Sequence, residues 1–93
     1  MKAELLYFRR MPIGETAFTE MVLWRVPTPV PGSSHAFRYR LALIVEGVCV
    51  VRYDNERGKG DHRHIAGREE PFVFTGPADL FAAFEADVRR IMA

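Results

Sequence analysis

Two histidines, His62 and His64, stand two residues apart at the end of a charged, glycine-rich segment that follows the apolar run Val48–Val51. Imidazole has an ordinary pKa of about 6.5, so one histidine can act as a general base and a second as a general acid. Cations surround the pair and can stabilise a charged phosphoryl group. These residue types indicate a polyanion site, and they suit cleavage of RNA without a metal ion.

In such a reaction, one histidine takes the proton of the 2′-hydroxyl group, a second group protonates the leaving oxygen, and cations stabilise the phosphorane. We predict that His62 and His64 are the acid–base pair, with Tyr53 as an alternative acid. Lys59 and Arg68 are the favoured phosphate contacts, because strand alternation points Arg63 away from the histidines. The full set of predicted phosphate-binding or RNA-binding residues is Arg40, Arg52, Arg57, Lys59, Arg63 and Arg68.

A β-hairpin around the glycines would place these residues on the two faces of a sheet. If Asp54 lies opposite Asp61, the facing pairs are Tyr53 with His62, Arg52 with Arg63, and Val51 with His64. Tyr53 then shares a face with both histidines, which are about 6.6 Å apart along the strand. On the other face the two arginines repel each other unless an anion or a nearby carboxylate lies between them.

Two other hypotheses fit the same segment. A metal ion would use His62 and His64 with an oxygen of Asp61 or Asp54, but residue 61 points away from residue 62 on a regular strand. We therefore predict neither a metal nor another cofactor. Alternatively, Arg57-Gly58-Lys59-Gly60 only binds an anion through backbone N–H groups and side-chain charge. The alternative to an endoribonuclease is thus a non-catalytic module that binds a polyanion or a protein partner.

Composition limits the class of protein. The 93 residues suffice for one modest core, and we predict a single domain, 1–93. The longest apolar run, Leu41–Val45, is far shorter than the roughly twenty residues of a membrane span, so no membrane contact is expected. The first residues lack the pattern of a signal peptide, and Cys49 is the single cysteine, which fits a cytoplasmic protein. The net charge is +1, yet residues 35–68 contain seven cations and four acids.

Alternating apolar and polar residues predict strands at about 2–10, 16–26, 36–46 and 48–54, and an irregular fifth strand at about 61–74. The third predicted strand has an apolar face and a face whose first half is basic, with Arg38 and Arg40. Pro27–Ser34 is expected to be an extended loop, because proline has no N–H group for a sheet. Pro77 suits the first turn of a helix at about 77–92. The predicted fold is α+β, an antiparallel meander of four to five strands with one C-terminal helix packed across one face.

The segment Tyr53–His64, YDNERGKGDHRH, resembles the signature of TumE-family toxins of bacterial and archaeal toxin–antitoxin pairs. The resemblance covers most of the chain, because the family layout also fits Met21–Pro27, Pro27–Ser34, Tyr39-Arg40, Gly67–Pro71 and the terminal helix. It implies a small cytoplasmic toxin held by a cognate antitoxin, often a helix-turn-helix protein encoded beside it. RNA cleavage is the default mechanism of small α+β toxins of this sort. The expected partners are therefore RNA and the antitoxin, and self-association into a homo-oligomer stays open.

Overall fold

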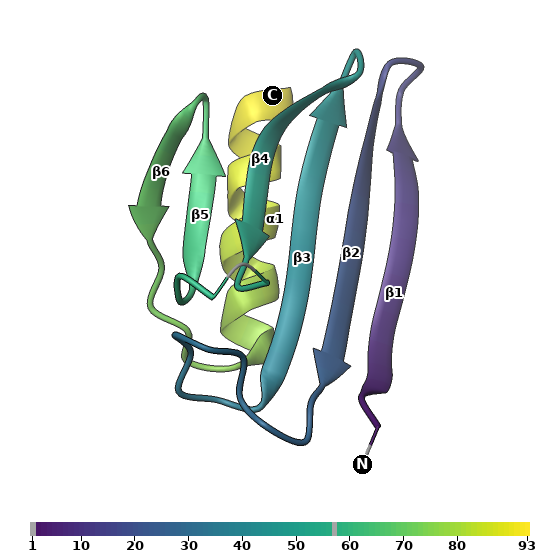
Figure 1. The fold of residues 1–93 in the computed structure, drawn as a ribbon. Coiled ribbons are helices and arrows are strands. Elements are labelled where there is room, and N and C mark those ends of the chain that lie inside the picture. Colours follow the sequence, from purple (N-terminus) through teal and green to yellow (C-terminus); the bar gives the residue numbers. More distant parts are fainter. Residues whose placement is uncertain (1, 57) are drawn as a thin grey trace.

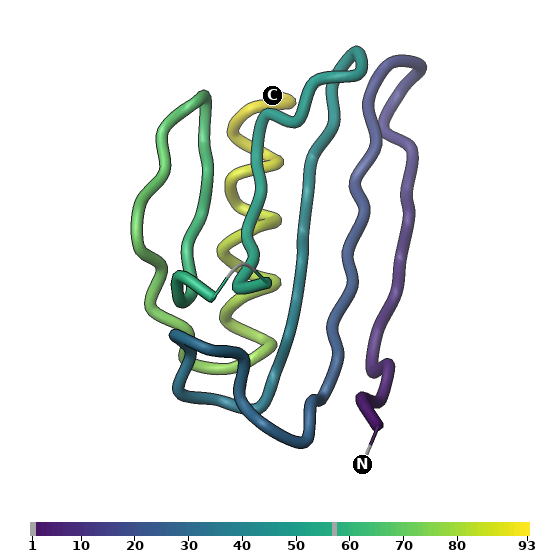
Figure 2. The backbone as a smooth tube through the Cα atoms, in the orientation of Figure 1, coloured from purple at the N-terminus to yellow at the C-terminus, as the bar shows by residue number. Residues whose placement is uncertain are grey.

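The computed structural model describes residues 2–56 and 58–93, which form a six-stranded sheet with one helix behind it (Figure 1). Each strand pairs antiparallel with the next along the chain, as the backbone tube shows (Figure 2). The predicted α+β meander with a C-terminal helix is confirmed. The elements are β1 (Glu4–Ile13), β2 (Ala17–Arg25), β3 (Phe37–Val45), β4 (Val48–Asp54), β5 (His62–Ile65), β6 (Arg68–Pro71) and α1 (Pro77–Met92).

The sheet has more strands than predicted, because residues 61–74 form two short strands instead of one irregular strand. Ala66 and Gly67 connect them, with φ angles of 51° and 82°. Two successive residues with positive φ are typical of tight hairpin turns that match the twist of the flanking strands. Glu46 and Gly47 use the same combination, with φ of 50° and 80°, between β3 and β4. The chain therefore reverses direction at Ala66 and Gly67.

β1 extends to Ile13, beyond the end predicted at residue 10, although Pro12 lies within it. Pro12 pairs with Phe18 of β2. An edge strand tolerates proline, since only one side of its backbone must supply hydrogen bonds to a neighbour. The helix begins at Pro77 and ends at Met92, as predicted. Among the described residues, no helix is long and apolar enough to cross a membrane.

The hydrophobic core lies between α1 and one face of the sheet (Figure 1). Leu80 and Phe84 of α1 are buried there with apolar side chains from β2, β3 and β4, namely Met21, Leu23, Tyr39, Leu41, Leu43, Val51 and Tyr53. Complete burial of one such aliphatic or aromatic side chain contributes about 1.5–3 kcal/mol. The alternate residues of each strand point to the opposite side, which we call the open face.

Two loops approach each other closely at the end of the sheet. A Cβ atom on Gly32, in the loop between β2 and β3, would lie 2.5 Å from the nitrogen of Gly60 and 2.7 Å from the carbonyl oxygen of Gly58. Gly32 and Gly60 also have positive φ angles of 91° and 85°. The loop after β2 therefore packs backbone to backbone on the turn between β4 and β5, and only glycine fits at this contact.

Replacing Gly32 with alanine is expected to destabilise the fold by about 2–4 kcal/mol, because the methyl group collides with backbone and the φ angle is unfavourable. Urea unfolding measures the loss. The matched control is Gly47→Ala, since Gly47 has a φ of 80° but nothing within 4 Å of the place that a methyl group would take. The control should lose only about 1 kcal/mol. Equal losses for the two variants would contradict tight packing of the loops.

Candidate acid–base and phosphate site

The register between β4 and β5 differs by one residue from the prediction. A shift of one residue moves every side chain to the other face of a sheet. His62 and His64 therefore share the open face with Arg52 and Asp54, and Tyr53 lies on the face covered by α1. The prediction that Tyr53 shares a face with the histidines is wrong. The observed pairs are Asp54 with His62, Tyr53 with Arg63, Arg52 with His64, and Val51 with Ile65.

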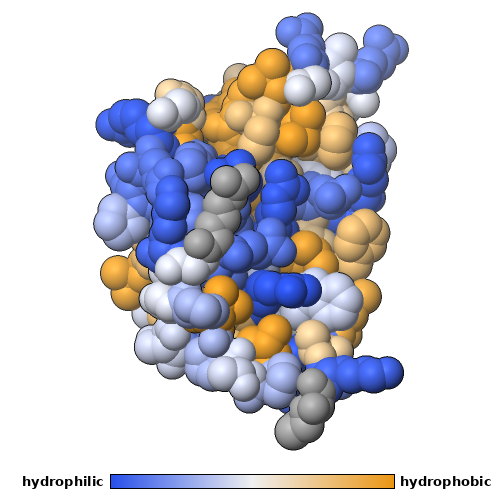
Figure 3. Space-filling view, viewed as in Figure 1, coloured by the Kyte–Doolittle hydropathy of each residue, from blue (hydrophilic) through white to orange (hydrophobic). Residues whose placement is uncertain are grey.

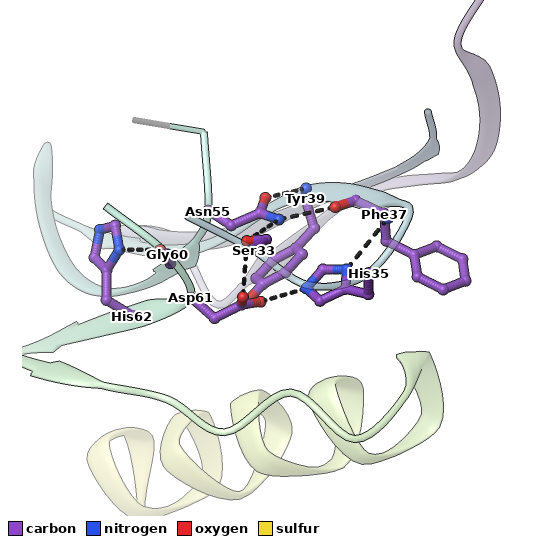
Figure 4. A network of polar contacts seen from close by, with 8 residues as sticks. All are labelled: Ser33, His35, Phe37, Tyr39, Asn55, Gly60, Asp61 and His62. Carbon is purple, nitrogen blue, oxygen red and sulfur yellow. Dashed lines mark hydrogen bonds and ion pairs between the residues drawn. The ribbon is translucent and has the colours of Figure 1, made fainter. Parts of the chain in front are cut away.

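Asp61 does not face Asp54 because three side chains from the preceding loop and β3 hold it elsewhere (Figure 4). Its carboxylate accepts hydrogen bonds from Ser33 Oγ at 2.8 Å, His35 Nε2 at 2.7 Å and the hydroxyl of Tyr39 at 2.6 Å. His35 Nδ1 accepts a hydrogen bond from a backbone N–H group, so the neutral ring has its proton on Nε2, where it donates to Asp61. With Asp61 fixed outside the hairpin, β5 begins at His62.

Asn55 is a second buried link between the same segments. Its Oδ1 atom accepts a hydrogen bond from the backbone nitrogen of Tyr39 at 3.1 Å. Its Nδ2 atom donates to the carbonyl oxygen of Phe37 at 2.8 Å and to Ser33 Oγ at 3.2 Å (Figure 4). Asn55 and Asp61 therefore fix both ends of the turn that positions the histidines. These roles were not predicted from the sequence, although a buried amide after a strand is a signal for such a link.

Tyr53 and Arg63 belong to the interior beneath α1. The buried hydroxyl group of Tyr53 donates to Asp87 of α1. Arg63 forms an ion pair with Glu70 at 2.5 Å and donates to the Tyr53 oxygen at 3.1 Å. Burial, followed by the hydrogen bond to Asp87, raises the pKa of Tyr53 to about 12. This tyrosine neither reaches the histidines nor releases its proton near neutral pH, so it is poorly placed as a general acid.

His62 lies low on the open face, with 4% of its surface exposed. Its Nδ1 atom is 2.9 Å from the carbonyl oxygen of Gly60, and its Nε2 atom is 2.9 Å from Asp54 Oδ1. Both neighbours of the ring are hydrogen-bond acceptors. The other oxygen of Asp54 lies 2.9 Å from Arg52 Nε. Both contacts of Asp54 are short. Within the described residues, however, neither Asp54 Oδ1 nor Arg52 Nε has a well-aligned hydrogen bond.

His64 is contacted by a hydrogen-bond donor, whereas His62 is contacted by acceptors, although the two ring centres are only 5.2 Å apart. Arg52 Nη2 lies 2.9 Å from His64 Nε2. Because arginine only donates, this nitrogen accepts, and the proton of the ring is on Nδ1. Burial and then the charge of Arg52 lower the pKa of His64, partly opposed by Glu69, whose carboxylate is 3.3 Å from the same nitrogen. Near neutral pH, His64 is therefore a neutral base.

A metal ion is the competing use of these side chains. Ligand atoms of His62, His64 and Glu69 lie within 4.8 Å of one another. The guanidinium group of Arg52, however, already contacts the lone pair of His64 Nε2 at 2.9 Å. A permanent positive charge at that distance opposes a divalent cation. The charge of Arg52 therefore disfavours a metal ion at this position. Of the two oxygen ligands considered from the sequence, Asp61 points elsewhere, whereas Asp54 lies 2.9 Å from His62 Nε2.

The other predicted cations are distributed over several places. Lys59 is exposed and lines an open pocket together with His62. Arg68 lies opposite Ile65, on the face covered by α1, so it is separated from the histidines and is no longer a favoured phosphate contact. Arg57 lies outside the described residues. Lys59 is thus the better placed of the two cations that the sequence favours.

Three arginines, Arg38, Arg40 and Arg52, lie on the open face. Arg40 is the neighbour of Asp54 in the sheet, and Arg52 is the neighbour of His64. Arg38 precedes Arg40 by two residues and points to the same side, but it was not among the predicted site residues. Seen from this side, hydrophilic surface gathers over β4, β5 and β6 (Figure 3). The open face therefore combines three arginines with the two histidines and the carboxylates of Asp54 and Glu69 on one hydrophilic surface.

A protein-family model described as Toxin TumE matches residues 5–92, nearly the whole chain. Searches of curated proteins and of solved structures gave no match. The match defines the class of protein as the toxin component of a toxin–antitoxin pair, which implies an antitoxin as its partner. The chain belongs to the TumE toxin family. The resemblance to the TumE family is thereby confirmed.

Proposed function

We propose that this toxin cleaves RNA on the open face of its sheet without a metal ion, with His64 as the general base. The supporting observation is the contrast between two adjacent histidines. His62 has acceptors at both ring nitrogens, whereas His64 faces the permanent donor Arg52. Acid–base cleavage needs one protonated and one neutral group in the same place.

The reaction begins when Arg52 turns from His64 Nε2 to the phosphate. His64 then accepts the proton of the 2′-hydroxyl group, and the 2′-oxygen forms a bond to phosphorus. The bond from phosphorus to the 5′-oxygen breaks, and that oxygen takes a proton from His62. The products are a 2′,3′-cyclic phosphate and a 5′-hydroxyl group. Solvent restores both protonation states, since His64 has gained one proton and His62 has lost one.

The neighbouring charges fit this sequence of events. Glu69, at 3.3 Å from His64 Nε2, stabilises the imidazolium ion that forms when His64 takes a proton. Arg52 lies beside His64, Lys59 lines a pocket with His62, and both cations can contact the charged phosphorane. Asp54 keeps His62 in place through its ion pair at 2.9 Å. Each charged group next to the histidines thus has a role in either proton transfer or phosphate binding.

The test is incubation of the purified toxin, free of antitoxin, with RNA in the presence of EDTA, followed by chemical analysis of the new ends. We expect cleavage that EDTA does not reduce, with 2′,3′-cyclic phosphate ends. Loss of cleavage with EDTA and its recovery with a divalent ion would contradict the metal-free mechanism.

The second candidate function is binding of RNA without turnover, which the surplus of cations on the open face supports. It predicts an affinity that falls steeply with salt, with a log–log slope of about −0.7 for each phosphate contact in single-stranded RNA. RNA that is bound but remains intact would favour this function over the nuclease.

A further inference from the structure

Trp24 and Arg38 form a contact on the open face, away from the histidines. They are direct neighbours across β2 and β3. The guanidinium carbon of Arg38 lies 5.5 Å from the centre of the Trp24 ring, and both residues are partly exposed. The adjacent residue, Leu23, points to the opposite side and is buried beneath α1. Trp24 therefore presents an aromatic surface on the same face as the proposed active site.

The charge of Arg38 has no counterpart in the described part of the chain. Its Nε atom is buried, and no group in residues 2–56 and 58–93 accepts a hydrogen bond from it. A second aromatic–arginine contact on this face differs in this respect: Arg10 lies 4.2 Å from the ring centre of Phe18 and also forms an ion pair with Glu20 at 3.3 Å. An unsatisfied buried donor is unfavourable. Arg38 is therefore the better candidate for binding an external anion.

We propose that Trp24 and Arg38 form a subsite for one nucleotide of single-stranded RNA, with the base stacked on Trp24 and the phosphate bound by Arg38. This inference rests on the proposed function. Trp24 is three strands from the histidines, about 14 Å across the sheet, and Arg38 is two strands away, about 10 Å. Arg40, two residues beyond Arg38 on β3, is the neighbour of Asp54 and continues this surface towards the histidines. A single strand can cross this surface, whereas bases paired in a duplex have no free ring face for the tryptophan.

Trp24 is the single tryptophan of the chain, so its fluorescence reports directly on this subsite. The probe is a single-stranded oligouridylate with 2′-O-methyl groups, which removes the attacking hydroxyl and prevents cleavage. We expect the oligonucleotide to quench the emission of Trp24 as it binds. A duplex RNA of equal length should bind through its phosphates with little quenching.

Variants give a second measurement, with affinity for a labelled oligonucleotide read by fluorescence anisotropy. Trp24→Ala is expected to weaken binding by about tenfold or more, the usual loss when one stacking aromatic is removed, and Trp24→Phe should retain most of the affinity. Arg38→Gln should weaken binding and reduce its salt dependence. Phe18→Ala is the matched control and should bind like the unmodified toxin, since Glu20 already compensates the cation beside Phe18.

The outcomes separate this subsite from the proposed cleavage. If Trp24→Ala binds the oligonucleotide normally and the emission of Trp24 does not change, the subsite is wrong, while cleavage at the histidines can still be observed. If quenching and loss of affinity occur but RNA remains intact, the subsite stands and the nuclease mechanism is wrong. If the single strand does not bind at all, both the subsite and the proposed cleavage are wrong.

Discussion

Replacing His64 with alanine is expected to lower the rate of RNA cleavage by about 10²–10⁴-fold, the usual effect of removing a general base. RNA affinity should change little, because Arg38, Arg40 and Lys59 remain on the surface. Cleavage rates under single-turnover conditions and binding of a 2′-O-methyl oligonucleotide measure the two quantities separately. A matched control is Val48→Ala, a truncation of an exposed side chain with 60% of its surface accessible. Cleavage at the unmodified rate by the His64 variant would show that another group is the base.

The pH dependence tests the same assignment without removing the histidine. Burial first, and the charge of Arg52 second, lower the pKa of His64 from its ordinary value of about 6.5. The base is therefore neutral and active at pH 7, and on the acidic side of the pH–rate profile the rate should fall as the pH drops through the lowered pKa. Arg52→Gln removes one cause of the shift, so the pKa should rise and the acidic limb of the pH–rate profile should move to higher pH. An unmoved limb would mean that Arg52 does not act on the base.

The sequence predicts the fold class well because each feature that determines it is local. Pro77 and the apolar stripe define α1 within one segment, and the alternation in residues 37–45 defines β3 and its two faces. The turn at Ala66 and Gly67 is the exception. The amino-acid composition does not reveal an alanine with a positive φ angle. The hairpin between β5 and β6 was therefore not predicted, and neither was the position of Glu69 beside His64.

The site depends on contacts between residues that are distant in the sequence, and local patterns do not contain them. The register of β5 follows from the binding of Asp61 by His35 and Tyr39, which are 26 and 22 residues away. Tyr53 is held by Asp87, 34 residues further along the chain. The predicted repulsion between Arg52 and Arg63 does not arise, because the two arginines lie on opposite faces. Because of this shift of one residue, Arg52 lies beside the histidines in place of Tyr53, which had been predicted as an alternative acid.

Asp61→Ala is expected to destabilise the fold by about 3 kcal/mol or more, because three hydrogen-bond donors lose one shared acceptor in a part-buried position. Urea unfolding measures the loss. Asp79→Ala is the control: Asp79 is exposed and accepts a hydrogen bond from Thr75, so its removal should change stability by no more than about 1 kcal/mol. Similar losses for the two variants would contradict a central role of Asp61 in the loop network.

Alkaline unfolding gives the same network a second and independent test. Burial, and then the hydrogen bond to Asp61, raise the pKa of Tyr39 above its ordinary value of about 10. The neutral tyrosine is thus favoured in the folded state, so this contribution to stability is fully present below pH of about 10 and decreases as the pH rises further. Without the Asp61 carboxylate, the folded-state pKa of Tyr39 falls towards the unfolded value, so the decline of stability should end at a lower pH and its total should be smaller. An unchanged decline would show that Tyr39 is held neutral by burial alone, and that Asp61 positions β5 through Ser33 and His35.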